Sequence, residues 1–169
     1  MKNEIDPAHE IGENVTITEK SQLLSITPEQ AKNIKSLRIE NLNIDFDFAD
    51  FFLTKCGVFD SLYFYGCGIY GCELFDIDHS DNLGCVNCSL TSNLASFVLE
   101  CISKWDFIKT LDLSQNKFGE DPEKLYSWMF NHIFGRITIE NLILTDNGFS
   151  EEWKKKIVST FENYTNITL

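Results

Sequence analysis

A spacing of apolar side chains that recurs along the chain constrains the fold more than any other feature of the sequence. In residues 108–118, an apolar residue is followed by Leu after three positions, by a second Leu after two more, and by Asn after another three. Residues 139–149 repeat this order, and residues 59–69 repeat it with Phe64 in place of the second Leu and Cys67 in place of Asn. Two further segments follow the pattern with one departure each, at Leu42 and at Ser80. Such internal repetition predicts a chain of stacked, similar units.

The number and the spacing of these segments exceed what composition explains. With 43% hydrophobic residues, the apolar positions together with Asn or Cys are expected by chance less than about once, whereas three full matches occur. The central Leu positions are separated by 25, 21, 28, 31 and 25 residues. They are Leu37, Leu62, Leu83, Leu111 and Leu142, followed by Ile167. We expect each to lie on a short β-strand with its side chain buried.

This pattern resembles the leucine-rich repeat family, and its longer intervals resemble the ribonuclease-inhibitor type. The resemblance covers about residues 34–169 and implies an α/β solenoid: a short right-handed arc with parallel strands on its concave face and helices on its convex face. We expect one domain over residues 14–169, made of an N-terminal cap (14–33), about five repeats and a terminal partial repeat. Residues 1–13, acidic and poor in core residues, are expected to be mobile.

Helix signals lie between the expected strands. Leu94, Val98 and Cys101 belong to one apolar helical face, with Ser92 or Asn93 as its cap. Helix starts are also predicted at 121–123 (Asp-Pro-Glu) and at 150–152 (Ser-Glu-Glu).

In the cap, Val15 and Ile17 alternate with polar residues and predict a strand. Leu23, Leu24 and Ile26 are interpreted as its partner strand, and Thr27-Pro28-Glu29-Gln30 predicts a capped helix start.

Charge and composition exclude several classes of protein. The chain has 169 residues, 26 acidic and 14 basic side chains, and a formal net charge of −12, which argues against nucleic-acid binding. The sequence contains no run of 18 apolar residues, so no membrane span is predicted. The first residues lack the apolar core of a signal peptide, so we expect a cytoplasmic protein with reduced thiols, or one delivered into a host cytosol without a Sec-type signal.

Two constellations suggest metal sites. A zinc hypothesis is permitted by four cysteines and a histidine, namely Cys67, Cys72, Cys85, Cys88 and His79. Only Cys85 and Cys88 have the spacing of a zinc-binding pair. The favoured interpretation places Cys85 in a buried strand position and Cys67 and Cys88 in the turn position of the repeat. Residues 76–81 start like a calcium loop but lack its later Gly and Glu. We therefore expect no bound metal and no cofactor.

No motif predicts an enzyme. The chain has three histidines, none of which follows a nucleophile elbow, and it has no phosphate-binding glycine loop. We expect a non-enzymatic protein.

Strand alternation predicts which residues face outward from the concave side. Beside the buried pairs lie Arg38, Glu40, Tyr63, Tyr65, Gly84, Val86, Asp112, Ser114, Ile143 and Thr145. All except Gly84 are the expected partner-binding residues, because Tyr and Arg are enriched in binding hot spots. The alternative is that single exposed apolar residues are ordinary on protein surfaces.

These observations predict a module that binds a basic or neutral protein partner through its concave face. A second hypothesis is an assembly or adaptor subunit that docks, or self-associates, through the open edge of its C-terminal strand at 167–169. A third is a microbial effector that acts on a host protein, and a more remote one is a zinc-binding protein.

Overall fold

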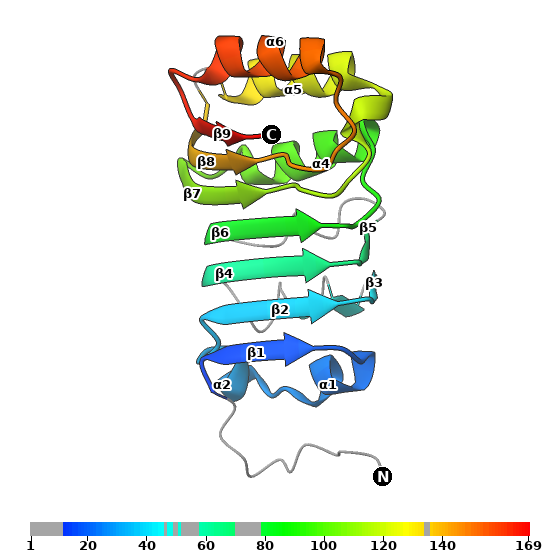
Figure 1. Ribbon diagram of the computed structural model, residues 1–169. Helices are drawn as coiled ribbons and strands as arrows, with labels where there is room; N and C mark the ends of the chain where they lie inside the picture. The colour runs from blue at the N-terminus through cyan, green and yellow to red at the C-terminus, as the bar shows by residue number, and fades with distance from the viewer. Residues whose placement is uncertain (1–11, 46, 49–50, 52–57, 70–78, 134–135) are drawn as a thin grey trace.

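In the computed structural model, the described residues are 12–45, 47–48, 51, 58–69, 79–133 and 136–169, and they form an α/β fold around a parallel sheet (Figure 1). The sheet has seven strands in the order β1-β2-β4-β6-β7-β8-β9. Their bounds are Asn14–Ile17, Ser36–Glu40, Val58–Tyr65, His79–Val86, Phe107–Asp112, Thr138–Ile143 and Asn166–Thr168. Strands that follow one another along the chain within this sheet are also neighbours in space. Each repeat of the sequence pattern therefore adds one strand to the same edge of the sheet.

The register of the sheet joins the central positions of the sequence pattern. Leu37 is the direct partner of Leu62, Leu62 of Leu83, and Leu83 of Leu111. The series continues through Leu142 to Ile167. The prediction of strands at these positions is confirmed, and the five Leu residues are fully or nearly fully buried. The spacing thus predicted both the strands and their order.

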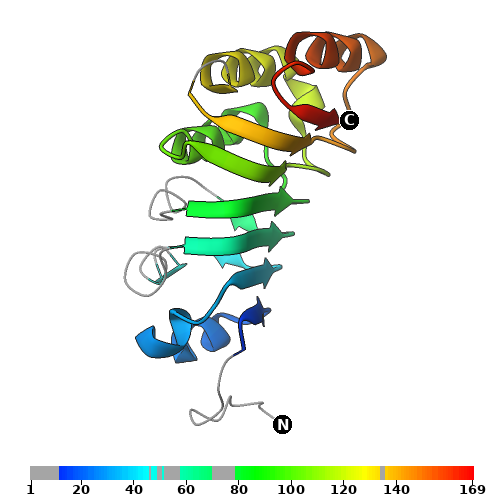
Figure 2. The same cartoon turned by 90° about the vertical axis from the view of Figure 1, so that its left-hand side faces the viewer.

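Three helices lie on one side of the sheet (Figures 1 and 2). They are α4 (Ser92–Ile102), α5 (Pro122–Ile133) and α6 (Glu151–Phe161). The predicted start of α6 is confirmed, because the Ser150 hydroxyl accepts the Trp153 N–H at 3.3 Å. The start of α5 is also confirmed. The predicted cap of α4 is wrong, since Thr91 is the N-cap residue and Ser92 is the first helical one.

The cap region contains one further correction. The predicted strand at Leu23–Ile26 is wrong, because α1 (Lys20–Ser25) occupies this segment and buries Leu23. A capping box between Glu19 and Gln22 starts this helix. β1 pairs with β2 instead, in parallel. The predicted capping box at Thr27 is confirmed at the start of α2 (Pro28–Ala31). Most of the segment expected to be mobile, residues 1–11, lies outside the described residues.

The turn after each of five strands has the same backbone form. The fourth residue after each central Leu is in the left-handed region, with φ between 53° and 61°. These residues are Asn41, Gly66, Asn87, Gln115 and Asp146. Asn, Asp and Gly tolerate this conformation better than other residues do. Beside the turns, β3 (Asn43–Ile44) and β5 (Gly68–Ile69) form a second, two-stranded sheet.

In four of these five turns the next position carries Cys or Asn, which connects neighbouring units, whereas in the first turn it carries Leu42. The Asn116 amide donates to the carbonyl of Cys85 at 2.7 Å and to that of Leu113 at 2.9 Å. The Cys88 thiol donates to the Phe64 carbonyl at 3.4 Å. Burial raises the pKa of Cys88 to about 12, so this thiol keeps its proton and acts as a donor. The Asn/Cys positions therefore satisfy carbonyls that the ends of the strands leave unpaired.

None of the described helices combines the length and the apolar character that a membrane span requires.

Candidate functional site

The side of the sheet away from α4, α5 and α6 carries no described helix (Figures 1 and 2). We call it the open face. Its central row consists of direct register partners on the seven strands, which are Thr16, Arg38, Tyr63, Gly84, Asp112, Ile143 and Thr168. Glu40, Tyr65 and Thr145 lie on the same face, beside the carboxyl ends of their strands. The middle of this row carries the ring of Tyr63 and the charges of Arg38 and Asp112, whereas the core on the other side of the sheet is mainly aliphatic and aromatic.

Tyr63 and Tyr65 stack on each other at the centre of this face. Their ring centroids are 5.7 Å apart and their planes differ by 14°. A Cβ atom at Gly84 would collide with the Tyr63 ring, so the ring lies across β6 where this strand has no side chain. The glycine therefore allows the ring to lie flat on the sheet. Both tyrosines are partly exposed, as a contact surface requires.

Arg38 completes one side of this cluster. Its guanidinium lies over the Tyr65 ring, 3.8 Å from the centroid, and its Nε donates to the Glu40 carboxylate. A cation above an aromatic ring is attracted by the electrons of the ring face. The ion pair with Glu40 fixes the guanidinium in this position, because it restrains the long side chain from one end.

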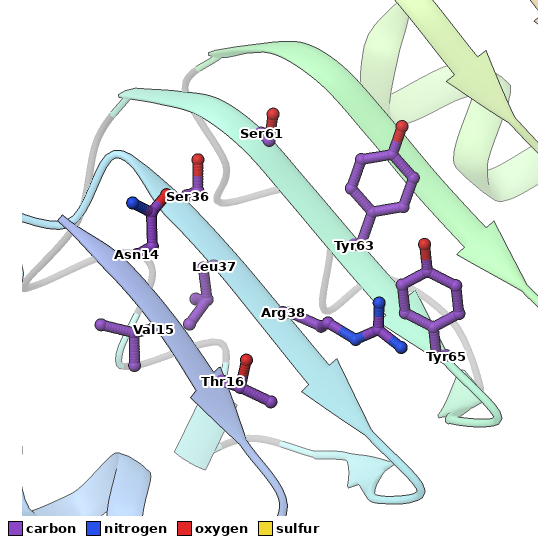
Figure 3. Close-up of a pocket in the computed structure, with 9 residues that line it drawn as sticks. All are labelled: Asn14, Val15, Thr16, Ser36, Leu37, Arg38, Ser61, Tyr63 and Tyr65. Carbon is purple, nitrogen blue, oxygen red and sulfur yellow. The ribbon is translucent and has the colours of Figure 1, made fainter.

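A cavity of about 260 Å³ lies on the open face between β1, β2 and β4 (Figure 3). Its wall includes the hydroxyl groups of Thr16, Ser36, Ser61, Tyr63 and Tyr65, together with Asn14 and Arg38. Sites for small molecules usually have ~300–1,000 Å³, so this cavity suits one or two side chains of a protein better than a cofactor.

The phenol groups beside the cavity are neutral hydrogen-bond donors. Burial raises the pKa of Tyr63, and the negative charge of Asp112 raises it further. Burial also raises the pKa of Tyr65, where the opposing effect of Arg38 is smaller. Both hydroxyls therefore keep their protons at neutral pH. The register places Asp112 one strand beyond Gly84 from Tyr63, on the same face as both phenol groups.

Two of the predicted binding residues are buried and are corrected here. Val86 is only 6% exposed, and it is the register partner of the bulky Tyr65. Ser114 is also 6% exposed, because its carbonyl accepts the N–H of Asn87 at 3.1 Å and the amide of Asn116 at 3.0 Å. Val86 is the last residue of β6, and Ser114 follows the end of β7 by two residues, where the chain enters the turn. Gly84, also expected to face outward, is buried.

The other predicted residues lie on the open face and are at least partly exposed. They are Arg38, Glu40, Tyr63, Tyr65, Asp112, Ile143 and Thr145. The structure brings the first five into one cluster around the two rings. Ile143 is the register partner of Asp112 and extends the central row toward β9.

A second row of polar residues, which was not predicted from the sequence, lies on the open face. It consists of Asn14, Ser36, Ser61, Asn82, Thr110, Asn141 and Asn166, which are register partners across all seven strands. Along this row the Asn82 amide donates to the Asp60 carbonyl at 2.9 Å, and the Asn141 amide donates to the Lys109 carbonyl at 3.1 Å. Each member precedes a central apolar position, so the same alternation could have found it. We call it the polar row.

The cysteines of the zinc hypothesis are engaged in the core. Cys67 and Cys88 bond backbone carbonyls through their thiols, Cys85 is fully buried, and Cys72 lies outside the described residues. In the part of the chain that the structure describes, no three His, Cys, Asp or Glu side chains are grouped so that they could hold a metal ion. Burial raises the pKa of Cys67, Cys85 and Cys88, which opposes the thiolate form that zinc binds.

Comparisons with models of protein families, with curated proteins and with solved structures gave no match to this chain.

Proposed function

We propose that this chain is a leucine-rich repeat module that binds a partner protein through the open face and catalyses no reaction. The observation that carries the proposal is the stacked pair of Tyr63 and Tyr65, partly exposed beside a cavity of about 260 Å³ on the helix-free side of the sheet. The alternate residues of the same strands build the core, so packing does not require aromatic residues here.

Three regularities support the repeat assignment. Each central apolar position pairs with the next across the sheet, as a stack of single-strand units requires. A left-handed residue follows at the same distance in five units. The Asn/Cys position then donates to carbonyls of the preceding unit. In this proposal the open face is the concave side of the arc.

The chemistry of the open face fits a protein surface as ligand. Tyr and Arg provide large contact areas that retain hydrogen-bonding groups, and they are frequent in the centres of interfaces. The polar row adds amides and hydroxyls that pair equally well with backbone groups of a partner. With a net charge of −12, attraction to a basic or neutral partner is expected to weaken as the salt concentration rises.

The same face offers little for catalysis. The cavity is lined by hydroxyl groups, but neither His79 nor His132 lies at its wall to act as a base. Hydroxyl nucleophiles need such a base close by. The arrangement can therefore bind and orient a ligand, whereas activation of a hydroxyl is not provided by its lining.

Paired substitutions test this proposal. We expect the double variant Tyr63→Ala/Tyr65→Ala to lose the proteins that the native chain captures from a lysate, as measured by quantitative mass spectrometry. The matched control is Phe130→Ala/Tyr164→Ala, which removes two aromatic side chains that are about half exposed, away from this cluster. Loss of the same proteins from the control, or their retention by the first variant in its folded form, contradicts the proposal.

A second candidate function is assembly at β9. Among the described strands, β9 pairs only with β8, so one of its edges has no strand beside it. Leu169 lines two neighbouring cavities of about 500 and 460 Å³, one of which also contains Val158. An edge of this kind can pair with β9 of a second copy across a two-fold axis. A monomeric mass by light scattering at high concentration excludes this candidate.

A further inference from the structure

The cluster on the open face contains one complete arrangement of ring, carboxylate and cation. Arg38 lies over Tyr65 at 3.8 Å and pairs with Glu40. The ring attracts the positive charge through its face, and the carboxylate neutralises that charge and accepts a hydrogen bond. All three residues lie on two neighbouring strands, β2 and β4.

Tyr63 and Asp112 provide the same ring and carboxylate without a cation. The register places Gly84 between them, with Tyr63 on one neighbouring strand and Asp112 on the other. Because Gly84 has no side chain, the Tyr63 ring lies across β6, the strand that separates it from Asp112. One oxygen of Asp112 accepts the Ser114 N–H at 3.0 Å. No described Lys, Arg or His forms an ion pair with this carboxylate.

Arg38 cannot supply the missing charge without losing its own contacts. It is already held by Tyr65 and Glu40, on the side of the cluster opposite to β7. A partly exposed carboxylate, one strand beyond Gly84 from the Tyr63 ring, is therefore left on the face that the proposed function assigns to the partner.

We propose that Tyr63 and Asp112 bind one basic side chain of the partner protein, with its charged group over the Tyr63 ring and paired with the free oxygen of Asp112. This inference rests on the proposed function and names the chemistry that the partner must bring. Arginine fits better than lysine, because its planar guanidinium stacks on a ring while its N–H groups reach a carboxylate. The net charge of −12 favours the approach of such a group.

A peptide titration tests the inference without knowledge of the partner. The probe is the capped tripeptide Gly-Arg-Gly, and the matched control peptide carries citrulline, which has nearly the same shape but no charge. Binding is followed by ¹⁵N–¹H correlation spectra of the labelled full chain, which also report whether each variant is folded. We expect the arginine peptide, and not the citrulline peptide, to shift the resonances of Tyr63, Gly84 and Asp112.

Variants then assign the binding to the two residues. Asp112→Asn keeps the oxygen that accepts the Ser114 N–H but removes the charge, and we expect it to weaken binding about fivefold. Tyr63→Leu should weaken binding by about threefold, whereas Tyr63→Phe keeps the ring and should retain most of the affinity. Glu123→Gln on α5 removes one negative charge elsewhere and should bind like the native chain.

The results separate this inference from the proposed function. The inference is overturned when both peptides shift the same resonances, when neither shifts them, or when Asp112→Asn binds like Glu123→Gln. In those cases the proposed function still stands or falls by the tyrosine substitutions described above, because these measure capture of a whole protein and not of one basic group.

Discussion

The side chain of Asn147 accepts the backbone N–H of Asn116 at 3.1 Å, and thereby joins the last two members of the Asn/Cys series. Asn116 in turn accepts the N–H groups of Cys88 and Leu90, both at 3.0 Å. These two buried amides thus join three successive units by hydrogen bonds. Backbone groups that are buried on folding lose their hydrogen bonds to water, and each of these amides replaces several of those bonds. Removal of an amide therefore leaves buried backbone groups with fewer hydrogen bonds.

The first prediction concerns the hydrogen bonds of Asn116. Asn116→Ala removes one hydrogen bond from each of three carbonyls and two N–H groups in the core. We expect the free energy of unfolding to fall by about 3 kcal/mol, measured by urea denaturation. For Asn116→Cys, the free energy of unfolding should fall by less, because Cys occupies the same position in two other units. A loss no larger than that of Asn163→Ala, a change at an exposed residue, contradicts this account.

The second prediction concerns the position of the Tyr63 ring. Gly84→Ala adds a methyl group where this ring lies, so the ring must leave β6 and its stack with Tyr65. We expect partner capture to fall as far as in the Tyr63→Ala/Tyr65→Ala variant while the far-UV circular dichroism is retained. Gly12→Ala is the control, since its added methyl group has open space. Equal partner capture by Gly84→Ala and Gly12→Ala argues against a role for the position of the Tyr63 ring.

The third prediction concerns pH. Burial lowers the pKa of His132, and the charge of Arg136 lowers it further. The unfolded chain, with an ordinary histidine pKa near 6.5, therefore binds the proton more readily than the folded one. The contribution of neutral His132 to the free energy of unfolding should be fully present well above pH 6.5. It should decrease as the pH falls through and below this value.

Thermal unfolding from pH 8 to pH 5 checks this dependence. His132 packs flat against Trp128, with ring centroids 4.9 Å apart, so His132→Phe preserves a ring there while removing the titration. We expect a shallower decrease of the midpoint with falling pH in this variant. An unchanged slope assigns the pH dependence to other groups.

The fourth prediction concerns the thiols. Burial raises the pKa of Cys85 strongly and that of Cys88 to about 12, and alkylation requires the thiolate. At pH 8, iodoacetamide should modify both residues in urea but hardly at all in the native chain, as measured by peptide mass spectrometry. Rapid modification of native Cys88 would show that its thiol is not the buried donor described above.

The five strands from β2 to β8 in the main sheet could be predicted from the sequence because each is marked by a buried apolar pair that recurs at similar intervals. The helix starts at Pro122 and Ser150 were predictable for a similar reason, since their signals are local. The segment at Leu23–Ile26 was mispredicted because its apolar residues fit a strand as well as a short helix. There the capping box of Glu19 and Gln22 decides the outcome.

The site was less predictable, because it depends on neighbours across strands. Alternation placed Val86 and Ser114 outward, but it contains no information on the Tyr65 ring or on the turns that follow β6 and β7. The polar row was missed because only the positions after each central Leu were considered. The role of Gly84 becomes visible only when its register partner is known to be Tyr63.

The most direct test of the central claim replaces single residues by the photo-crosslinking amino acid benzoylphenylalanine. Tyr63 on the open face is compared with Phe130 on α5, which is 49% exposed. The account predicts a crosslink to a partner protein from position 63 and none to the same protein from position 130. Crosslinks from position 130 alone would contradict it, because the partner would then bind the helical side.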